Sequence, residues 1–256
     1  MEKPLFWLNG ASSGIGYAVA ENLAKQGAAL ILASRSQEKL EAKKKLLEKL
    51  GAYSVETVLF DVSQKMDEGT IETHLKGRKI MGLLLNGGGP RPGPILSFTT
   101  EDMASANELL VAGPTRFLLS MLNHMVPHKS SVVAITSSAV KEPVRGLNLS
   151  AIYRAAFVVL LKNLSKEIGH MGIRINNVAP GKILTEHLEK LIQGAAQKNN
   201  TSVELEKESW EKVSALNRIG SPEEIANVIE FLLTEKSSFV NGQTIFVDGN
   251  STESYF

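Results

Sequence analysis

Leu5-Phe6-Trp7-Leu8-Asn9-Gly10-Ala11-Ser12-Ser13-Gly14-Ile15-Gly16 decides the fold, because a short apolar run leads into a glycine-rich turn and a helical pattern that extends to Lys25. The order predicts a buried strand, a turn and a helix. Its glycines suit a backbone that approaches a pyrophosphate closely, and the free N–H groups at a helix start attract anions. Glycines before helices also occur for conformational reasons alone, so the turn by itself does not settle a function. The predicted phosphate cradle consists of Gly10, Ser12, Ser13, Gly14, Ile15 and Gly16.

Further motifs follow this turn in a fixed order. They are Asp61-Val62, Asn86-Gly87-Gly88-Gly89, Ser137, Pro180-Gly181 with Thr185, and Gly242-Gln243 before Val247-Asp248-Gly249. With these motifs the chain resembles the short-chain dehydrogenase/reductase family, and most of all its 3-oxoacyl-carrier-protein-reductase-like branch. The resemblance spans essentially the whole chain. It implies a nicotinamide cofactor, a small-molecule carbonyl or alcohol substrate, and Thr185 facing the nicotinamide carboxamide.

The pattern of apolar runs predicts an α/β fold. Strands are expected near 4–9, 28–33, 55–60, 82–86, 131–136, 174–179 and 243–247, with helices between them. Most runs are continuous instead of alternating, as in a parallel sheet that helices cover on both faces. We therefore expect one Rossmann-type, doubly wound parallel sheet of about seven strands in a single domain, residues 1–256. The motifs fall at the carboxyl ends of the strands, where such sheets bind ligands, so they should converge on one cleft.

Composition narrows the function classes. The chain has 256 residues, is 43% hydrophobic and carries a net charge of +1. The near-neutral charge and the absence of a basic arm argue against nucleic acid as the main partner. With no cysteine, neither a disulfide nor a thiolate metal site is expected, and no metal site is predicted. No apolar run approaches the length of a membrane span, so we expect a cytoplasmic protein without a membrane partner.

The end of the second strand decides which cofactor is preferred. Ala33-Ser34-Arg35-Ser36 offers no carboxylate for the ribose hydroxyls, whereas the Arg35 guanidinium can bind a 2′-phosphate. We predict NADP(H) in preference to NAD(H), with Ser34 and Arg35 at the phosphate; the alternative is a solvated arginine beside a helix start. Asp61 is expected to accept a hydrogen bond from the adenine amino group with Val62 beside it, unless it caps the following segment. Asn86, Gly87, Gly88, Pro180 and Gly181 complete the predicted cofactor site.

The catalytic centre departs from the family pattern. The family uses a serine, a tyrosine, a lysine four residues after the tyrosine, and an asparagine. Ungapped counting from Glu167, Gly172 and Pro180-Gly181 places Ser150 at the tyrosine position and Arg154 at the lysine position. The asparagine position falls on Leu110, so Ser137 alone is kept.

A rival register keeps Tyr153 as the tyrosine but then places Phe157 where lysine belongs. Tyr153 is a candidate proton donor, paired with Arg154 or Arg145, although tyrosines on apolar helices most often pack. Arg154 can supply a fixed positive charge and ribose contacts, but it does not release a proton. Ser150 has the alternative reading of a helix cap.

Charged residues cluster where the mouth of the site is expected, and they suit an anionic or carrier-bound substrate. They are Arg91, Lys141, Glu142, Arg145 and Lys182. Ordinary solvated loop charge is the alternative reading. The stretch 185–217 predicts two helices around a polar joint, which would form a lid over the substrate; a simple surface excursion is the alternative. The helix predicted from Ser150 to Met171 is more apolar than one buried face requires, which predicts a homodimer or homotetramer.

Three functions stay open at this point. The first is an NADP(H)-dependent oxidoreductase acting on a carbonyl or alcohol. The second is a catalytically impaired NADP(H)-binding or sensing module. The third is a structural subunit of an active relative.

Overall fold

The computed structural model describes residues 3–255, in which one sheet of seven parallel strands has the order β3-β2-β1-β4-β5-β6-β7. The strands are β1 (Leu5–Asn9), β2 (Ala29–Ser34), β3 (Ser54–Leu59), β4 (Gly82–Leu85), β5 (Ser131–Ile135), β6 (Arg174–Pro180) and β7 (Thr244–Val247). Each begins and ends within one residue of its predicted bounds. The predicted doubly wound α/β fold is confirmed.

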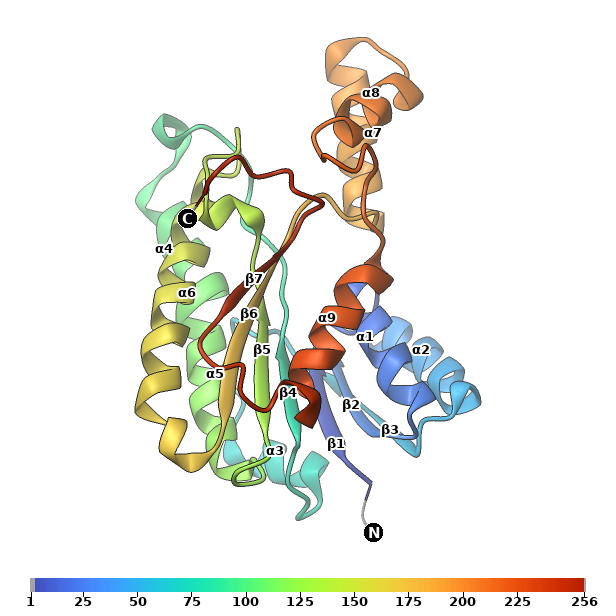
Figure 1. Cartoon of the computed structure of the whole chain (residues 1–256), viewed down its shortest axis with the longest axis vertical. Coiled ribbons are helices and arrows are strands. Elements are labelled where there is room, and N and C mark those ends of the chain that lie inside the picture. The colour runs from blue at the N-terminus through green and yellow to red at the C-terminus, as the bar shows by residue number, and fades with distance from the viewer. Residues whose placement is uncertain (1–2, 256) are drawn as a thin grey trace.

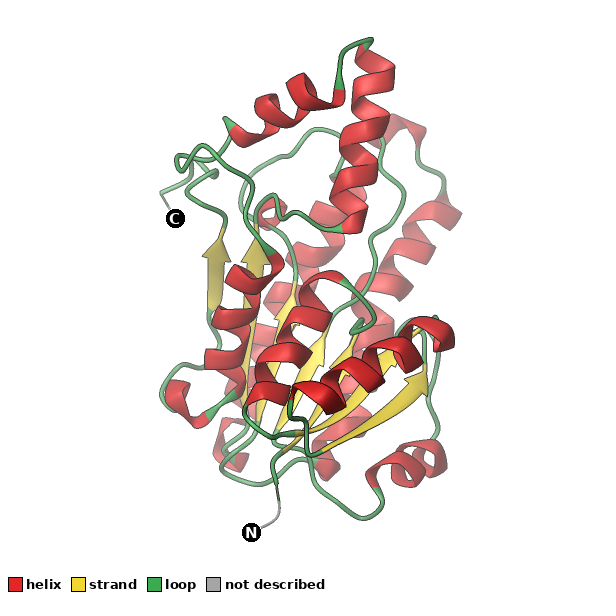
Figure 2. Ribbon diagram, turned by 90° about the vertical axis from the view of Figure 1, so that its right-hand side faces the viewer, coloured by secondary structure: helices red, strands yellow, loops and turns green. Residues whose placement is uncertain are grey.

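Helices cover both faces of the sheet (Figures 1 and 2). They are α1 (Gly14–Lys25), α2 (Gln37–Leu50), α3 (Glu68–Leu75), α4 (Thr100–Asn107), α5 (Gly113–Met121), α6 (Asn148–Glu167), α7 (Glu186–Asn199), α8 (Val203–Glu211) and α9 (Pro222–Leu233). Apolar residues of α1, α2 and α9 form one core, and those of α3, α5 and α6 form the other. Because both faces are covered, β1, β2, β4 and β5 are buried at every residue, as their continuous apolar runs predict.

The strand order reverses between β1 and β4, which are neighbours in the sheet although two strands separate them in the chain. Crossovers on opposite faces leave a crevice at the carboxyl ends of two such strands. The glycine turn after β1 and the glycine run after β4 lie there. Helices α7 and α8 stand beyond this carboxyl edge of the sheet (Figures 1 and 2).

Helix α6 begins two residues earlier than predicted. Leu147 occupies the N-cap position, so Ser150 lies inside the first turn. The reading of Ser150 as a helix cap is therefore wrong. The helix ends at Glu167 and a 3-10 turn, Gly169–Met171, follows it. None of the helices in residues 3–255 has the length and apolarity needed to cross a membrane.

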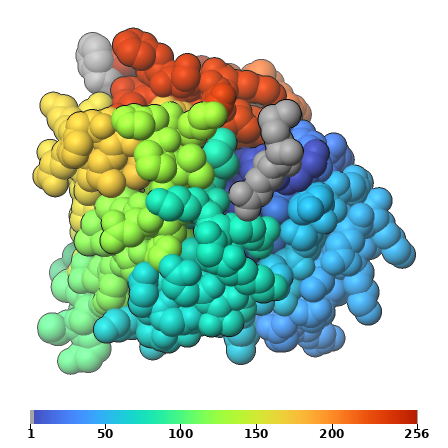
Figure 3. Space-filling view, turned by 90° about the horizontal axis from the view of Figure 1, so that it is seen from below, coloured from blue at the N-terminus to red at the C-terminus, as the bar shows by residue number. Residues whose placement is uncertain are grey.

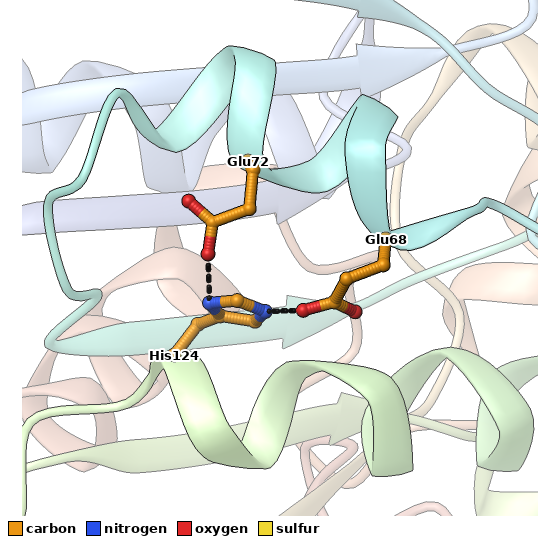
Figure 4. A group of neighbouring side chains, drawn as sticks. All are labelled: Glu68, Glu72 and His124. Carbon is orange, nitrogen blue, oxygen red and sulfur yellow. Dashed lines mark hydrogen bonds and ion pairs between the residues drawn. The ribbon is translucent and has the colours of Figure 1, made fainter.

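A charged cluster joins α3 to the segment after α5 at the opposite, amino edge of the sheet, which is the face that Figure 3 views from below. The buried imidazole of His124 lies between two carboxylates, with Nε2 2.7 Å from Glu68 Oε1 and Nδ1 3.3 Å from Glu72 Oε1 (Figure 4). The three side chains are close enough to share a metal ion. Each ring nitrogen already faces its own carboxylate, so the arrangement is that of a paired histidine that ties α3 to the core.

Candidate active site

The predicted phosphate cradle is a tight turn that side chains could not enter. Gly10 has φ +64°, in the left-handed region that favours glycine. A Cβ on Gly16 would lie 2.3 Å from the carbonyl oxygen of Gly10, so helix α1 and the turn approach as closely as backbone allows. Asn86 Nδ2 donates to the same Gly10 oxygen at 3.2 Å, which connects the end of β4 to the end of β1. Gly10 and Gly16 have no room for a side chain, so the backbone of this turn can approach a dinucleotide pyrophosphate closely.

The start of α1 is open to an anion. Its N-cap residue, Ser13, makes no side-chain capping hydrogen bond, and its first turn contains no acidic residue. Helix α7, by contrast, is capped by Thr185 and carries Glu186 and Glu189 in its first turn. The unpaired N–H groups and the positive end of the α1 dipole therefore remain available to a phosphate.

Thr185 reaches the cradle from the end of β6. Its Cγ2 lies 3.2 Å from the position of a Cβ on Gly14, and its Oγ1 accepts the Leu188 N–H. Gly181, which follows Pro180, donates its N–H to Val247 O at 3.1 Å and so fixes the start of this segment against β7. The chain after β6 thus lies beside the glycine turn after β1.

The residues predicted at the adenosine end lie together. Arg35 Nη1 is 3.9 Å from Asp61 Oδ2, and Arg35 Nη2 is 3.7 Å from the position of a Cβ on Gly88. The Arg35 side chain is 69% exposed, so it is free to turn toward a phosphate. Asp61 Oδ1 accepts both the N–H and the hydroxyl of Ser63, as the capping alternative requires, while Oδ2 points to Arg35. Ser34 is buried and accepts the Ser36 N–H, and Val62 lies against Gly87.

Arg154 lies across the ends of β4 and β5, beside Gly88 of the predicted cofactor site. Its Nη1 donates to Ile135 O at 2.9 Å, its Nη2 to Gly88 O at 3.3 Å, and its Nε to Ser150 Oγ at 3.1 Å. Burial lowers its pKa to about 10, so it stays protonated at neutral pH. Ser137, two residues beyond Ile135, accepts the Ala139 N–H through its Oγ at 3.2 Å. Both serine oxygens are occupied as acceptors, so each hydroxyl can present its proton to a substrate.

Tyr153 is less well connected. Its side chain is half-buried and makes no hydrogen bond within the part of the chain that the structure describes. The expected pairing of Tyr153 with Arg154 is absent, because the Arg154 guanidinium is bonded to Ser150 and two carbonyls. Leu110 is buried within a π-helical segment, Glu108–Ala112, and brings no polar group to the site. Lys162 donates to Gly242 O at 2.8 Å, on the far side of α6.

Three of the four cations predicted around the mouth have partners of their own, whereas Arg145 is exposed and has no hydrogen bond, ion pair or ring contact within residues 3–255. Arg91 forms a two-bond ion pair with Asp102. Lys141 lies over the Phe246 ring and Lys182 over the Trp210 ring. The last contact joins α8 to the end of β6, and both residues line a cavity of about 120 Å³. Sequence reasoning missed Trp210, and an isolated tryptophan in a charged helix gives no signal that it contacts a lysine 28 positions away.

Comparison with known proteins identifies the family. A family model described as enoyl-(acyl carrier protein) reductase matches residues 10–252. Levodione reductase of Leifsonia aquatica is 32% identical over 97% of this chain and 94% of its own length, and the NADPH-dependent reductase BacG of Bacillus subtilis is 27% identical over 99% and 100%. L-sorbose reductase of Gluconobacter frateurii, solved with NADPH and L-sorbose, superposes with a TM-score of 0.91 at 26% identity over 99% of this chain and 98% of that one. The chain belongs to the short-chain dehydrogenase/reductase family of NAD(P)H-dependent oxidoreductases.

Proposed function

We propose that the protein is an NADP(H)-dependent oxidoreductase that interconverts a carbonyl and an alcohol through an altered catalytic centre. The observation that carries this is the placement of Arg154. Its guanidinium donates to Ile135 O and Gly88 O, at the ends of β5 and β4, and the neighbouring end of β1 leads into the turn where Gly10 and Gly16 leave no room for a side chain. A 3-oxoacyl compound is one candidate substrate, in line with the resemblance.

The cofactor would be held by residues from four strand ends. The turn from Gly10 to Gly16 takes the pyrophosphate, Arg35 takes the 2′-phosphate, and Asp61 with Val62 takes the adenine. Thr185 and Arg154 take the nicotinamide end. When bound, NADP(H) supplies or accepts the hydride.

The chain itself supplies orientation and hydrogen bonds. Ser137 presents its hydroxyl proton to the substrate oxygen, Ser150 presents its own to another polar group of the substrate, and the Arg154 charge stabilises negative charge on the bound substrate. Neither serine is an effective acid, so proton transfer falls to Tyr153 or to water. General acid-base assistance is typically worth about 10²- to 10⁴-fold, which bounds the loss in rate.

The direct test restores the pair of the family. A Ser150→Tyr, Arg154→Lys double variant should raise NADPH-dependent turnover on a panel of carbonyl compounds, by up to about 10²- to 10⁴-fold. Ser150→Tyr alone is the matched control, because it adds the phenol without the lysine. A double variant that is no faster than wild type would contradict the register that places Ser150 at the tyrosine position.

Tyr153→Phe tests the rival proton donor. Unchanged turnover in this variant removes Tyr153 from the mechanism and leaves water as the proton source. A loss of about 10²-fold or more, with cofactor affinity unchanged, assigns the proton transfer to Tyr153.

A second candidate function is an NADP(H)-binding or sensing module without turnover. The observation that favours it is Leu110, whose buried apolar side chain stands where the family has an asparagine. This reading expects tight NADPH binding, no turnover with any carbonyl, and no effect of Ser137→Ala. A structural subunit of an active relative would instead bind the cofactor weakly.

We further propose that residues 185–217 act as a lid and that the protein forms a homodimer or homotetramer. Helices α7 and α8 meet at a polar joint, and the Lys182–Trp210 contact would hold α8 closed. On the outer face of α6, Ile152 and Val159 are 51% and 61% exposed, as expected of a surface that a second copy covers. Light scattering of purified protein tests the second point.

A further inference from the structure

The charge of Arg154 has no counterion. No carboxylate lies within 4.0 Å of its guanidinium anywhere in residues 3–255, and its three hydrogen-bond partners are two carbonyls and a hydroxyl, all neutral. A half-buried charge with neutral partners is costly unless an anion joins it. Arg35, Arg91, Arg116 and Arg218 each face a carboxylate.

Arg174 is the instructive comparison, because it too is bonded largely to backbone carbonyls. Its partners include Leu232 O and Thr234 O, at the carboxyl end of α9. The negative end of a helix dipole compensates a cation placed there. The carbonyls that face Arg154 belong to the end of a strand and to a loop, and the nearby start of α6 is a positive helix end without an acidic residue in its first turn.

Arg154 also has two N–H groups that make no hydrogen bond within residues 3–255. A guanidinium has five N–H groups, and the three hydrogen bonds leave one on Nη1 and one on Nη2. The Ser150 oxygen accepts from Nε, so its own proton is free for a ligand. Two N–H groups and one O–H group match the oxygens of a carboxylate.

The phosphates of the cofactor would bind elsewhere than at Arg154. The pyrophosphate site is the turn between Gly10 and Gly16 at the end of β1, and the 2′-phosphate site is Arg35 after β2. The nicotinamide ribose offers hydroxyls, which are neutral. The anion that would compensate Arg154 is therefore left to the substrate.

We propose that Arg154 and Ser150 bind a carboxylate of the substrate, and that the substrate is a carbonyl compound with its carboxylate on a neighbouring carbon. This inference rests on the proposed function. The carboxylate and the carbonyl of the substrate must be close together, because the residues that would bind them are close together. Arg154 donates to Ile135 O, and Ile135 is two residues before Ser137, which orients the carbonyl. A carrier-bound thioester would place its phosphate far from the reacting carbon and leave Arg154 uncompensated.

The test is an equilibrium titration that needs no turnover. Oxamate and its neutral isostere oxamide are titrated by calorimetry into the protein, once without cofactor and once with NADP⁺. Oxamate should bind at least about tenfold more tightly than oxamide, the lower end of what hydrogen bonds to a charged group contribute. Arg154→Gln should weaken the binding of oxamate by at least about tenfold, and Ser150→Ala should weaken it by less.

Arg91→Gln is the matched control, because it removes the same charge near the mouth from an arginine that already has a carboxylate. Its oxamate affinity should equal that of wild type. Oxamide binding as tightly as oxamate, or oxamate binding unchanged in Arg154→Gln, would overturn the proposal. If Arg154→Gln does not fold, two other results decide the question. Wild-type protein should bind oxamate more tightly than oxamide, and Arg154→Lys should bind oxamate more weakly than wild type. Failure of NADP⁺ to bind would count against the proposed function, and the cofactor-free titration would still test the carboxylate site.

Discussion

Gly16→Ala probes the close contact on which the cofactor site depends. The added methyl would lie 2.3 Å from Gly10 O and 2.9 Å from Gly10 C, whereas ordinary contact begins at 3.4 Å. Both atoms are backbone, so the glycine turn or the start of α1 must move by about 1 Å, and overpacking of this kind costs about 1 to 3 kcal/mol of unfolding free energy. The same movement separates the N–H groups that would bind the pyrophosphate. NADPH affinity should therefore fall by more than the fold is weakened.

Gly194→Ala is the matched control. Gly194 lies in α7, and a Cβ there would meet no atom within 4 Å. Alanine in an open helical position stabilises by up to about 1 kcal/mol. Both variants are assayed by urea unfolding and by NADPH titration under conditions where each is folded. NADPH binding as tight in Gly16→Ala as in wild type would refute the role of the turn.

Two further substitutions separate binding from stability. Arg35→Ala should weaken NADPH by about 1 to 3 kcal/mol and leave NADH nearly unchanged, because a charge-assisted hydrogen bond to the 2′-phosphate is lost; equal losses for both cofactors in a titration would count against it. Hydrogen bonds from Arg218, and then from the Ser221 N–H, lower the pKa of Glu224 from 4.5 to about 2. Because the folded-state value is the lower one, this carboxylate stabilises the fold above pH 4.5 and the effect is lost as the pH falls toward 2. The Tm difference between wild type and Glu224→Gln should accordingly be largest near neutral pH and shrink in acid, and a difference independent of pH would contradict this reading.

Sequence alone predicts the strands and the glycine turn well, because both depend on local patterns. Continuous apolar runs such as Val132-Val133-Ala134-Ile135 indicate strands that are covered on both faces. Every strand begins and ends within one residue of its predicted bounds. The glycine turn after β1 has few alternatives, since its backbone geometry excludes side chains. These features need no knowledge of distant contacts.

The chemistry at the carboxyl edge is harder to predict, because it depends on which side chains meet across the sheet. Counting places Arg154 at the lysine position, but nothing in the sequence indicates that it bonds to Ile135 O and Gly88 O and lacks a counterion. Arg91 has the same formal charge and lies near the expected mouth, yet Asp102 neutralises it. Which of these two arginines lacks a carboxylate partner follows from the fold.

The most direct test of the central claim, an intact NADP(H) site beside an altered catalytic pair, is an equilibrium titration of the purified protein with NADPH and NADH. We expect tight binding of NADPH and at least about tenfold weaker binding of NADH, since Arg35 has a 2′-phosphate to contact only in the former. Absence of binding to either nucleotide would contradict the claim and direct attention to partner proteins.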